Sequence, residues 1–495
     1  MDLSLPDRLL REISARLDAD AEARLAFPGE SGDRQPVHTM YGGAQIFRSD
    51  SASRLGESAL KALETNAPDA ATLAIALGRS ASDPIIARLY PRVVEKLHRE
   101  PVEDFRIDFE DGFGVRPDPD EDRAALEAAD EVYAGMANAT LPPFIGIRSK
   151  QFSPELRARS FRTLDMFLSR LVKRSSGSIP ERFHVTLPKV VSVEQAAVFG
   201  EMIGVLEEKL SLSPGAIKAE LMIEITSSIF DEEGRVNVAR LVRAAGERCV
   251  GAHFGTYDYT ASCQITAAYQ GMTHPACDFA RHVMQVSLAG TGVWLSDGAT
   301  NVMPVPIYRD DRLTKQQVAE NQRAVHHAWK QHFDEIRHSL VHGFYQGWDL
   351  HPAQLVTRYA AVQSFFLESM DAAAERLSNF VEKATQATLV GDVFDDAATG
   401  QGLLNFFARA INSGAISAEE ASTRTGVTLQ ELSDRSFLSI LKNRRCGRPC
   451  WASAIRNSPA IACGVPPRAL TNCAEKRAHL DRRTSPGRAR QTKRD

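Results

Sequence analysis

Four segments decide the fold of this chain: FRIDFEDG (105–112), FIGIRSK (144–150), LMIEITSS (221–228) and HFGTYDYTAS (253–262). Each begins as an apolar run that is typical of a buried strand, and each carries charged side chains at or just after the end of that run. In enzymes built on a barrel of parallel strands, the active site lies at the rim where the carboxyl ends of the strands meet. The four segments therefore predict an enzyme of this architecture, with carboxylates and a guanidinium at the rim.

Eight strand-like runs alternate with helical segments between about residues 36 and 355. The runs are predicted at 37–41, 105–109, 144–148, 183–187, 220–224, 250–254, 292–296 and 341–345. Residues 193–210 and 236–249 have apolar side chains every three or four positions, which is typical of helices that pack on a sheet. Alternating strands and helices indicate parallel strands. We therefore predict an α/β fold, a (β/α)8 TIM barrel.

The chain is expected to have four parts. They are a helical arm (1–35), the barrel (36–355), a helical C-terminal domain (356–435) and a disordered basic tail (436–495). The helical domain is expected because residues 355–386 and 400–414 both have helical periodicity. Disorder is expected because residues 442–495 lack periodicity and are rich in Pro, Arg and Ser, with 14 Lys and Arg against three Asp and Glu.

The composition of the chain argues against several classes of protein. The chain has no run of about 18 apolar residues, so no membrane partner is expected, and an N-terminus without signal-peptide features predicts a cytoplasmic protein. The seven cysteines form no CxxC pair, which argues against a zinc knuckle or a disulfide framework. A nucleic-acid-binding tail is one interpretation of the terminal charge, but a poorly constrained extension is the interpretation that we favour.

Glu224 and Asp258 follow consecutive predicted strands, so they should be neighbours on the rim. Two carboxylates that leave room for water suit Mg2+, which prefers oxygen ligands, with Mn2+ as the alternative ion. A surface acid or a helix cap is the other interpretation of either residue. For Glu224 the apolar neighbours argue against exposure, and we predict that the pair binds a divalent cation.

Other charged residues lie at the ends of other predicted strands. Asp108, Glu110 and Asp111 form an acidic cluster that can hold waters on a metal or share a proton, or alternatively cap a helix. Arg148 ends an apolar strand, and its planar guanidinium suits the carboxylate of a 2-oxo acid. A salt bridge to the acidic cluster is the alternative for Arg148. Lys189 is a second candidate substrate contact with the same alternative.

Two candidates come from later segments. His351, after the last predicted strand, is a candidate substrate contact, although a lone histidine more often has a structural role. Asp395 and Asp396 precede the predicted helix at 400–414. For these two residues N-capping is the alternative to a catalytic role.

In these segments the chain resembles the superfamily of Mg2+-dependent barrels that contains malate synthase, the citrate lyase β-subunit and the HpcH/HpaI aldolases, within a distinct aldolase-like subfamily. The resemblance covers about residues 100–400. Six motifs carry it in the same order: RIDFEDG (106–112), LPKVVSVEQA (187–196), PGAIKAELMIEI (214–225), GTYDYTAS (255–262), GFYQGWDLHPAQ (343–354) and DDAAT (395–399).

The resemblance implies a role for most of these residues. Glu224 and Asp258 would bind Mg2+, and Arg148 would orient a glyoxylate- or pyruvate-like carboxylate. Glu110 and Asp108 would lie in the outer shell of the metal. By analogy with the superfamily, the protein would also be a homo-oligomer.

The DDAAT motif implies a second substrate. Asp396 would be the base that removes a proton from the methyl group of an acyl-CoA. The leading hypothesis is therefore a Mg2+-dependent condensation like that of malate synthase, with acyl-CoA as co-substrate. An aldolase or citryl-CoA-type lyase is the alternative within the superfamily, and a non-catalytic binding scaffold is the alternative from another class.

Overall fold

The computed structural model describes residues 5–20, 28–29, 33–310, 312–382, 388–390, 393–395, 397–434, 436–437 and 440. Eight parallel strands close into a barrel in chain order, and the last strand pairs with the first. The strands are β1 (His38–Gly43), β2 (Asp104–Asp108), β3 (Phe144–Arg148), β4 (Phe183–Leu187), β5 (Ile217–Ile223), β6 (Cys249–Phe254), β7 (Trp294–Ala299) and β8 (Gln346–Asp349). The predicted TIM barrel is confirmed.

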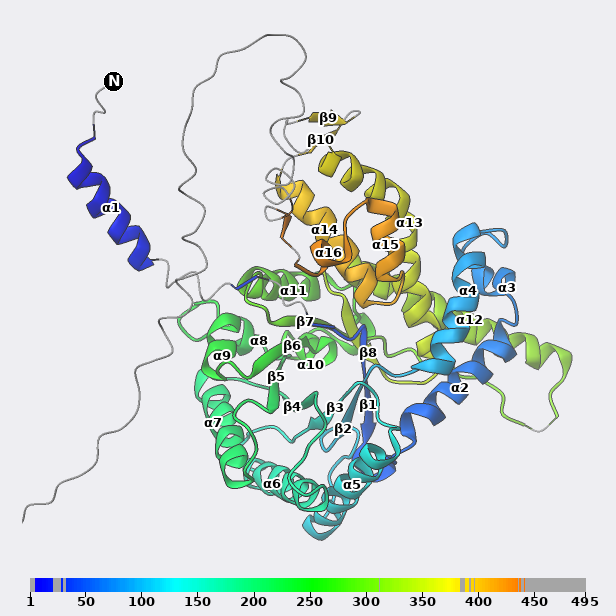
Figure 1. The fold of residues 1–495 in the computed structure, drawn as a ribbon. Helices are drawn as coiled ribbons and strands as arrows, with labels where there is room; N and C mark the ends of the chain where they lie inside the picture. The colour runs from blue at the N-terminus through cyan, green and yellow to red at the C-terminus, as the bar shows by residue number, and fades with distance from the viewer. Residues whose placement is uncertain are drawn as a thin grey trace, which may run out of the picture. The chain divides into compact units, whose positions relative to one another are not determined.

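Helices follow each strand and surround the barrel (Figure 1). After β1 come the short helix η2 (Ala44–Ile46), α2 (Ser51–Asn66), α3 (Ala70–Ala76) and α4 (Pro84–Arg99). Single helices follow the next three strands: α5 (Asp118–Asn138), α6 (Arg157–Arg174) and α7 (Val193–Lys209). Then come α8 (Thr226–Ile229), α9 (Val238–Ala244), α10 (Thr256–Ser262), η3 (Ala267–Tyr269), α11 (Pro275–Leu288), α12 (Lys315–Val341) and α13 (Gln354–Glu382). None of the helices in the described ranges is both long and apolar enough to cross a membrane.

The eighth strand is not where the sequence analysis placed it. Residues 341–345 have the composition of a strand, but the structure continues α12 to Val341 and ends it at the C-cap His342. Gly343 then turns the chain with a φ of 81°, a left-handed value that glycine adopts without strain. The strand itself is the short, polar segment β8, which lacks the apolar pattern that identified the other strands.

The additional C-terminal helices are also confirmed. They are α14 (Ala397–Asn412), α15 (Ala418–Thr425) and α16 (Leu429–Asp434). A short antiparallel ribbon of β9 (Thr388–Val390) and β10 (Val393–Asp395), which was not predicted, precedes them. The arm contains α1 (Asp7–Asp20). Residues 441–495, which include most of the predicted tail, lie outside the described residues, and the four-part division of the chain stays a prediction.

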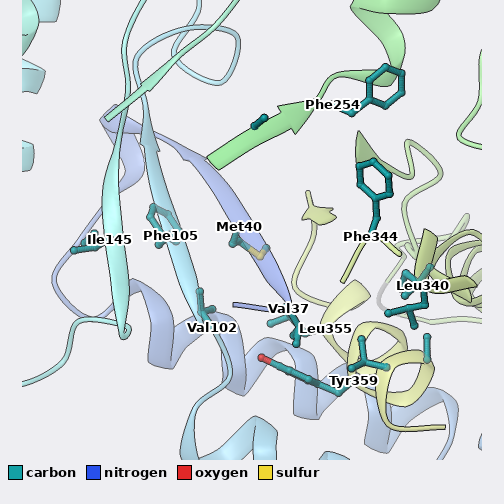
Figure 2. Close-up of a cluster of buried hydrophobic side chains, with 14 of the residues drawn as sticks. Val37, Met40, Val102, Phe105, Ile145, Phe254, Leu340, Phe344, Leu355 and Tyr359 are labelled. Atoms are coloured by element: carbon teal, nitrogen blue, oxygen red, sulfur yellow. The ribbon is translucent and has the colours of Figure 1, made fainter. Parts of the chain in front are cut away.

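The apolar core lies between the barrel strands and the helices that cover them. Figure 2 shows part of it, where Val37 and Met40 of the β1 region lie near Leu355 and Tyr359 of α13. These side chains are almost fully buried, and burial of such apolar surface is the main force that stabilises the fold. The result is a rigid barrel that holds the strand ends in place.

Inside the barrel, one layer of side chains is charged. Arg106 of β2 is buried and pairs with Asp104 on its own strand and with Glu220 of β5, the latter at 2.7 Å. Because β2 and β5 are not neighbours in the barrel, the pair crosses the interior. Side chains alternate along a strand, so Asp108 lies on the same face as Arg106 and points into the barrel at its carboxyl end.

Candidate active site

The structure gathers the charged residues that the sequence singled out at the carboxyl ends of β2 to β6. We call this set the rim cluster, and its members are Asp108, Glu110, Asp111, Arg148, Lys189, Glu224 and Asp258. They come from five consecutive strand ends, and parallel strands of a barrel bring these ends to one edge. Salt bridges and hydrogen bonds connect the members to one another.

Arg148 is held by Asp108. Its Nε and Nη2 donate hydrogen bonds to the two carboxylate oxygens at 2.7 and 2.6 Å. Asp108 also accepts hydrogen bonds from the backbone N–H groups of Glu110 and Gly112. Burial alone would raise the pKa of Asp108, but Arg148 and these hydrogen bonds outweigh it and lower the pKa. The salt-bridge interpretation of Arg148 is thus what the structure shows, and Asp108 has no free oxygen for a metal.

One edge of the Arg148 guanidinium remains turned to the rim cluster. Nη1 lies 3.3 Å from Glu110 Oε2 and 3.7 Å from Asp111 Oδ2, which are ion-pair distances longer than those to Asp108. The guanidinium carbon lies 4.8 Å from the centre of the Tyr41 ring and 5.9 Å from that of Trp348. Aromatic faces attract a guanidinium and fix its plane. Arg148 is therefore held in one orientation, with Nη1 directed toward Glu110, Asp111 and the sulfur of Met222.

The acidic cluster does not cap a helix. The next helix, α5, begins at Asp118 with Pro117 as its N-cap, well beyond Asp111. Glu110 instead accepts a hydrogen bond from the Lys189 ammonium at 2.7 Å. Burial raises the pKa of Glu110, although Arg148 and Lys189 partly offset that effect. The helix-cap alternative for these residues is therefore wrong.

Lys189 lies between carboxylates of three strand ends. Its ammonium is 2.7 Å from Glu110, 3.5 Å from Asp111 and 3.6 Å from Asp258, and its backbone N–H donates to Glu224 Oε1 at 2.8 Å. Burial would lower the pKa of Lys189, but Glu110 and Glu224 raise it above its ordinary value. The residue has a φ of 50°, a conformation that is costly for a residue other than glycine and that occurs often at functional sites.

Glu224 and Asp258 form a pair of carboxylates with different environments. Glu224 follows β5 and is buried, and burial together with the nearby charge of Asp258 raises its pKa to about 8. Asp258 lies in the first turn of α10, with 39% of its side chain exposed. Gly255, before α10, leaves the space for Glu224, because a Cβ there would overlap the Glu224 carboxylate. The surface-acid interpretation is wrong for Glu224.

This donor set fits Mg2+. The buried carboxylate of Glu224 has a like-charged neighbour, and a cation between the two would relieve their repulsion. The exposure of Asp258 leaves a path for the waters that Mg2+ retains. The oxygen-only chemistry of the pair excludes a preference for softer metals.

Two predicted residues are not in the rim cluster. His351 follows β8, and its Nδ1 accepts a hydrogen bond from the backbone N–H of Ala353 at 3.2 Å. Its ring lines a cavity of about 770 Å³ together with Tyr308 and Arg309. A structural role for His351 is therefore visible, and a substrate contact stays a prediction. Asp396, the predicted base, lies outside the described residues.

The aromatic walls of the site are not predicted by the sequence. The sequence pattern places Tyr41 at the end of a strand and Trp348 within the segment 343–354, without a role in the site for either residue. Their rings lie 4.8 Å apart, and both lie beside Arg148. The position of Tyr41 at the end of a predicted strand could have indicated that it lies at the rim. Its contact with Trp348 could not be predicted, because that contact depends on the pairing of β8 with β1.

A family model described as "Domain of unknown function (DUF6986)" matches residues 16–440. No curated protein matches the chain significantly. Among solved structures, a citrate lyase from Burkholderia xenovorans LB400 is similar with a TM-score of 0.52 at 17% identity, over 81% of this chain and 98% of that one.

Two further structures match with lower scores. They are malate synthase from Haloferax volcanii (TM-score 0.40, 15% identity, 82% of this chain and 99% of that one) and the protein CitE from Mycobacterium tuberculosis in complex with magnesium, acetoacetate and coenzyme A (TM-score 0.42, 14% identity, 77% and 99%). At sequence identities this low, the comparisons show a similarity of fold alone. The similarity to citrate lyase confirms the predicted resemblance at that level.

Proposed function

The chain belongs to the DUF6986 family, whose description names no activity, and we propose that it is a Mg2+-dependent enzyme that forms or cleaves a carbon–carbon bond of a 2-oxo acid. One observation carries the proposal: Glu224 and Asp258, two carboxylates from consecutive strand ends, both contact Lys189 in a rim cluster that also contains Arg148. This arrangement would provide a site for a hard cation and a site for a small anion at one end of the barrel.

Glu224 and Asp258 would hold the metal, with Glu110 near it. Bound Mg2+ would supply Lewis acidity toward the oxygen of a 2-oxo group. In the structure Lys189 already neutralises part of the charge of Glu110 and Asp258. Once a metal is bound to these carboxylates, Lys189 would be free to move toward the substrate.

Arg148 would orient the substrate carboxylate through Nη1. Asp108 fixes the opposite edge of the guanidinium with two hydrogen bonds, so Arg148 loses little rotational freedom when it binds an anion. Tyr41 and Trp348 would exclude water from one side of the bound acid. A fixed cation in a site shielded from water stabilises developing negative charge better than a mobile one.

We also propose a co-substrate for the reaction. In a malate synthase-like condensation the partner is an acyl-CoA, and Asp396 would be the base. The cavity of about 770 Å³ is lined by α2 and by the segments that follow β7 and β8, and it carries the cationic side chains of Lys61 and Arg309. These two side chains would bind the phosphates of a CoA, because ammonium and guanidinium groups are suited to phosphate.

The test is the release of free thiol by the purified protein with Mg2+, glyoxylate and acetyl-CoA. We expect release that EDTA abolishes and that Mg2+ or Mn2+ restores. Glu224→Gln and Asp258→Asn should each reduce turnover at least about 100-fold without changing the circular dichroism spectrum, because a lost ligand costs more than a lost outer-shell partner. Glu232→Gln, an exposed acid beyond α8, is the matched control and should have normal turnover.

Aldol cleavage is the second candidate, favoured by the segment 343–354 that resembles the citrate lyase side of the superfamily. Metal-dependent release of pyruvate from a 4-hydroxy-2-oxo acid, with no thiol release, would support it and would leave Asp396 without a role. If Mg2+ binds and neither reaction occurs, the barrel is better explained as a binding scaffold. Full activity in both metal-ligand variants would contradict the proposed site.

A further inference from the structure

Asp278, His338 and His342 form a second cluster of side chains that can bind a metal, and it shares no residue with the rim cluster. Asp278 lies on α11, His338 lies in the last turn of α12 and His342 is the C-cap of α12. One candidate ligand atom from each residue lies within 4.8 Å of the other two. All three residues are partly exposed, so an ion can reach them from solvent.

His342 presents a free ring nitrogen to the cluster, whereas His338 donates a hydrogen bond from Nε2 to Asp278, and an ion would take the place of that proton. His342 Nδ1 lies 2.8 Å from the backbone carbonyl of His338, so this nitrogen carries the proton and donates it. Nε2 of His342 then has a free lone pair, and it makes no hydrogen bond to any residue in the described part of the chain. His338 Nε2 lies 2.7 Å from Asp278 Oδ1. A backbone carbonyl that fixes one ring nitrogen is the usual support of a metal-binding histidine.

The charges near the cluster favour a cation. Buried Arg281 pairs with Asp278 and, at 3.0 Å, with buried Asp297. Ser339 also donates a hydrogen bond to Asp297 at 2.6 Å. Two carboxylates and one guanidinium carry a formal charge of one negative unit. A divalent ion would therefore bind in a region with net negative charge.

We propose that Asp278, His338 and His342 bind a divalent transition-metal ion of the Zn2+ type, with a water molecule in the fourth position. Two imidazole nitrogens and one carboxylate form a typical donor set for Zn2+, whereas Mg2+ prefers oxygen ligands. The ion would join α11 to α12. None of the three residues belongs to the rim cluster.

The ion would have a stabilising role, because it would link side chains of two helices that are separate in the sequence. An ion that binds only the folded chain raises its stability in proportion to the logarithm of the ion concentration. The proposal does not depend on the proposed enzyme activity, and its test uses no turnover measurement.

The experiment uses the full chain without an affinity tag, first treated with a chelator and then titrated with Co2+ or Zn2+. We expect Co2+ to give the visible absorption bands of a tetrahedral site and Zn2+ to displace it with a stoichiometry of one ion per chain. At about a 100-fold excess of Zn2+ over its Kd, the melting temperature should rise by about 3 °C. Absence of binding in the native chain would overturn the proposal.

Variants test whether the ion binds to Asp278, His338 and His342. The double variant His338→Gln with His342→Gln should lose the Co2+ bands and the Zn2+-dependent shift, whereas the exposed His327→Gln on the same helix should keep both. Glu224→Gln with Asp258→Asn should also keep them, which separates this site from the rim cluster. Should the double variant fail to fold, Asp278→Asn should weaken Zn2+ binding at least about 10-fold. Unchanged binding in the folded variants would overturn the proposal.

Discussion

Arg148 and Asp108 form a bidentate ion pair in the rim cluster. Two hydrogen bonds at 2.6 and 2.7 Å join them, and both side chains are almost fully buried. A buried charge that loses its partner keeps its desolvation penalty without compensation. The pair therefore fixes both the position of Arg148 and part of the stability of the barrel.

Asp108→Asn should lower the free energy of unfolding by about 3 kcal/mol, because it leaves the Arg148 guanidinium buried without its counter-charge. Urea unfolding followed by circular dichroism measures this change. The matched control is Asp130→Asn, which removes an equally bidentate but half-exposed partner of Arg170, with both bonds at 2.8 Å. The control should cost less than about 1 kcal/mol. Equal losses in the two variants would contradict our account of the buried pair.

A second residue, His184, should make the stability of the protein depend on pH. It is buried in the barrel on β4, and burial lowers its pKa to about 3. The unfolded chain binds a proton at this residue below about pH 6.5, whereas the folded chain does not until about pH 3. Above about pH 6.5 His184 therefore does not change the free energy of unfolding. As the pH falls from about 6.5 toward 3, His184 lowers the free energy of unfolding by about 1.4 kcal/mol per pH unit.

Unfolding free energies at pH 6.5 and pH 5 measure this effect, which should be a loss of about 2 kcal/mol from His184. His184→Gln should remove that part of the pH dependence, and the exposed His327→Gln should leave it unchanged. A slope that is identical in the native chain and in His184→Gln would exclude His184 as the source.

At the scale of elements, β3 and β4 approach each other closely at Gly146. This glycine pairs with His184 across the two strands, and a Cβ on Gly146 would overlap the carbonyl of His184. That obstacle is backbone and cannot rotate away. The close approach holds the ends of β3 and β4, and with them Arg148 and Lys189, next to each other.

Gly146→Ala should therefore destabilise the protein by about 3 kcal/mol, since overpacking of a backbone contact forces the strands apart. The control Gly402→Ala lies on the exposed face of α14, where a Cβ meets no atom within 4 Å. There alanine should stabilise the helix by up to about 1 kcal/mol. Thermal unfolding of both variants measures the difference, and a neutral Gly146→Ala would refute the close contact.

At the scale of the whole molecule, the hydrophobic core extends beyond the barrel to the last described residues. Phe437 and Ile440 are buried and belong to the same core cluster as the barrel residues. The ring of Phe437 lies 4.9 Å from that of Phe380 on α13 and fills the space beside Gly400. The C-terminal helices are thus joined to the barrel through α13.

A chain that ends at residue 434 should therefore be less stable than one that ends at residue 441. The shorter chain loses Phe437 and Ile440, and each large buried side chain contributes about 2–5 kcal/mol. The longer chain keeps every core residue that the structure describes, so we expect it to melt within about 1 °C of the full chain. Differential scanning calorimetry of the three chains measures this, and equal stability of both truncations would contradict the prediction.

The sequence alone was sufficient for the class of fold and for the members of the rim cluster. Apolar periodicity is a local property of the chain, so it identified seven of the eight strands near their true positions. Parallel strands then oblige Asp108, Arg148, Glu224 and Asp258 to meet at one edge. That inference needs only the order of the strands, and none of the distances.

The contacts within the site were decided by the tertiary structure. The tilt of the strands and the closure of the barrel decide whether Arg148 pairs with Asp108. They also decide where the Lys189 ammonium lies and which aromatic rings flank the guanidinium. Local sequence does not contain that information, because residues from distant segments determine each contact. For the same reason, β8 was misplaced: its short polar segment becomes a strand because β1 and β7 provide partners on both sides.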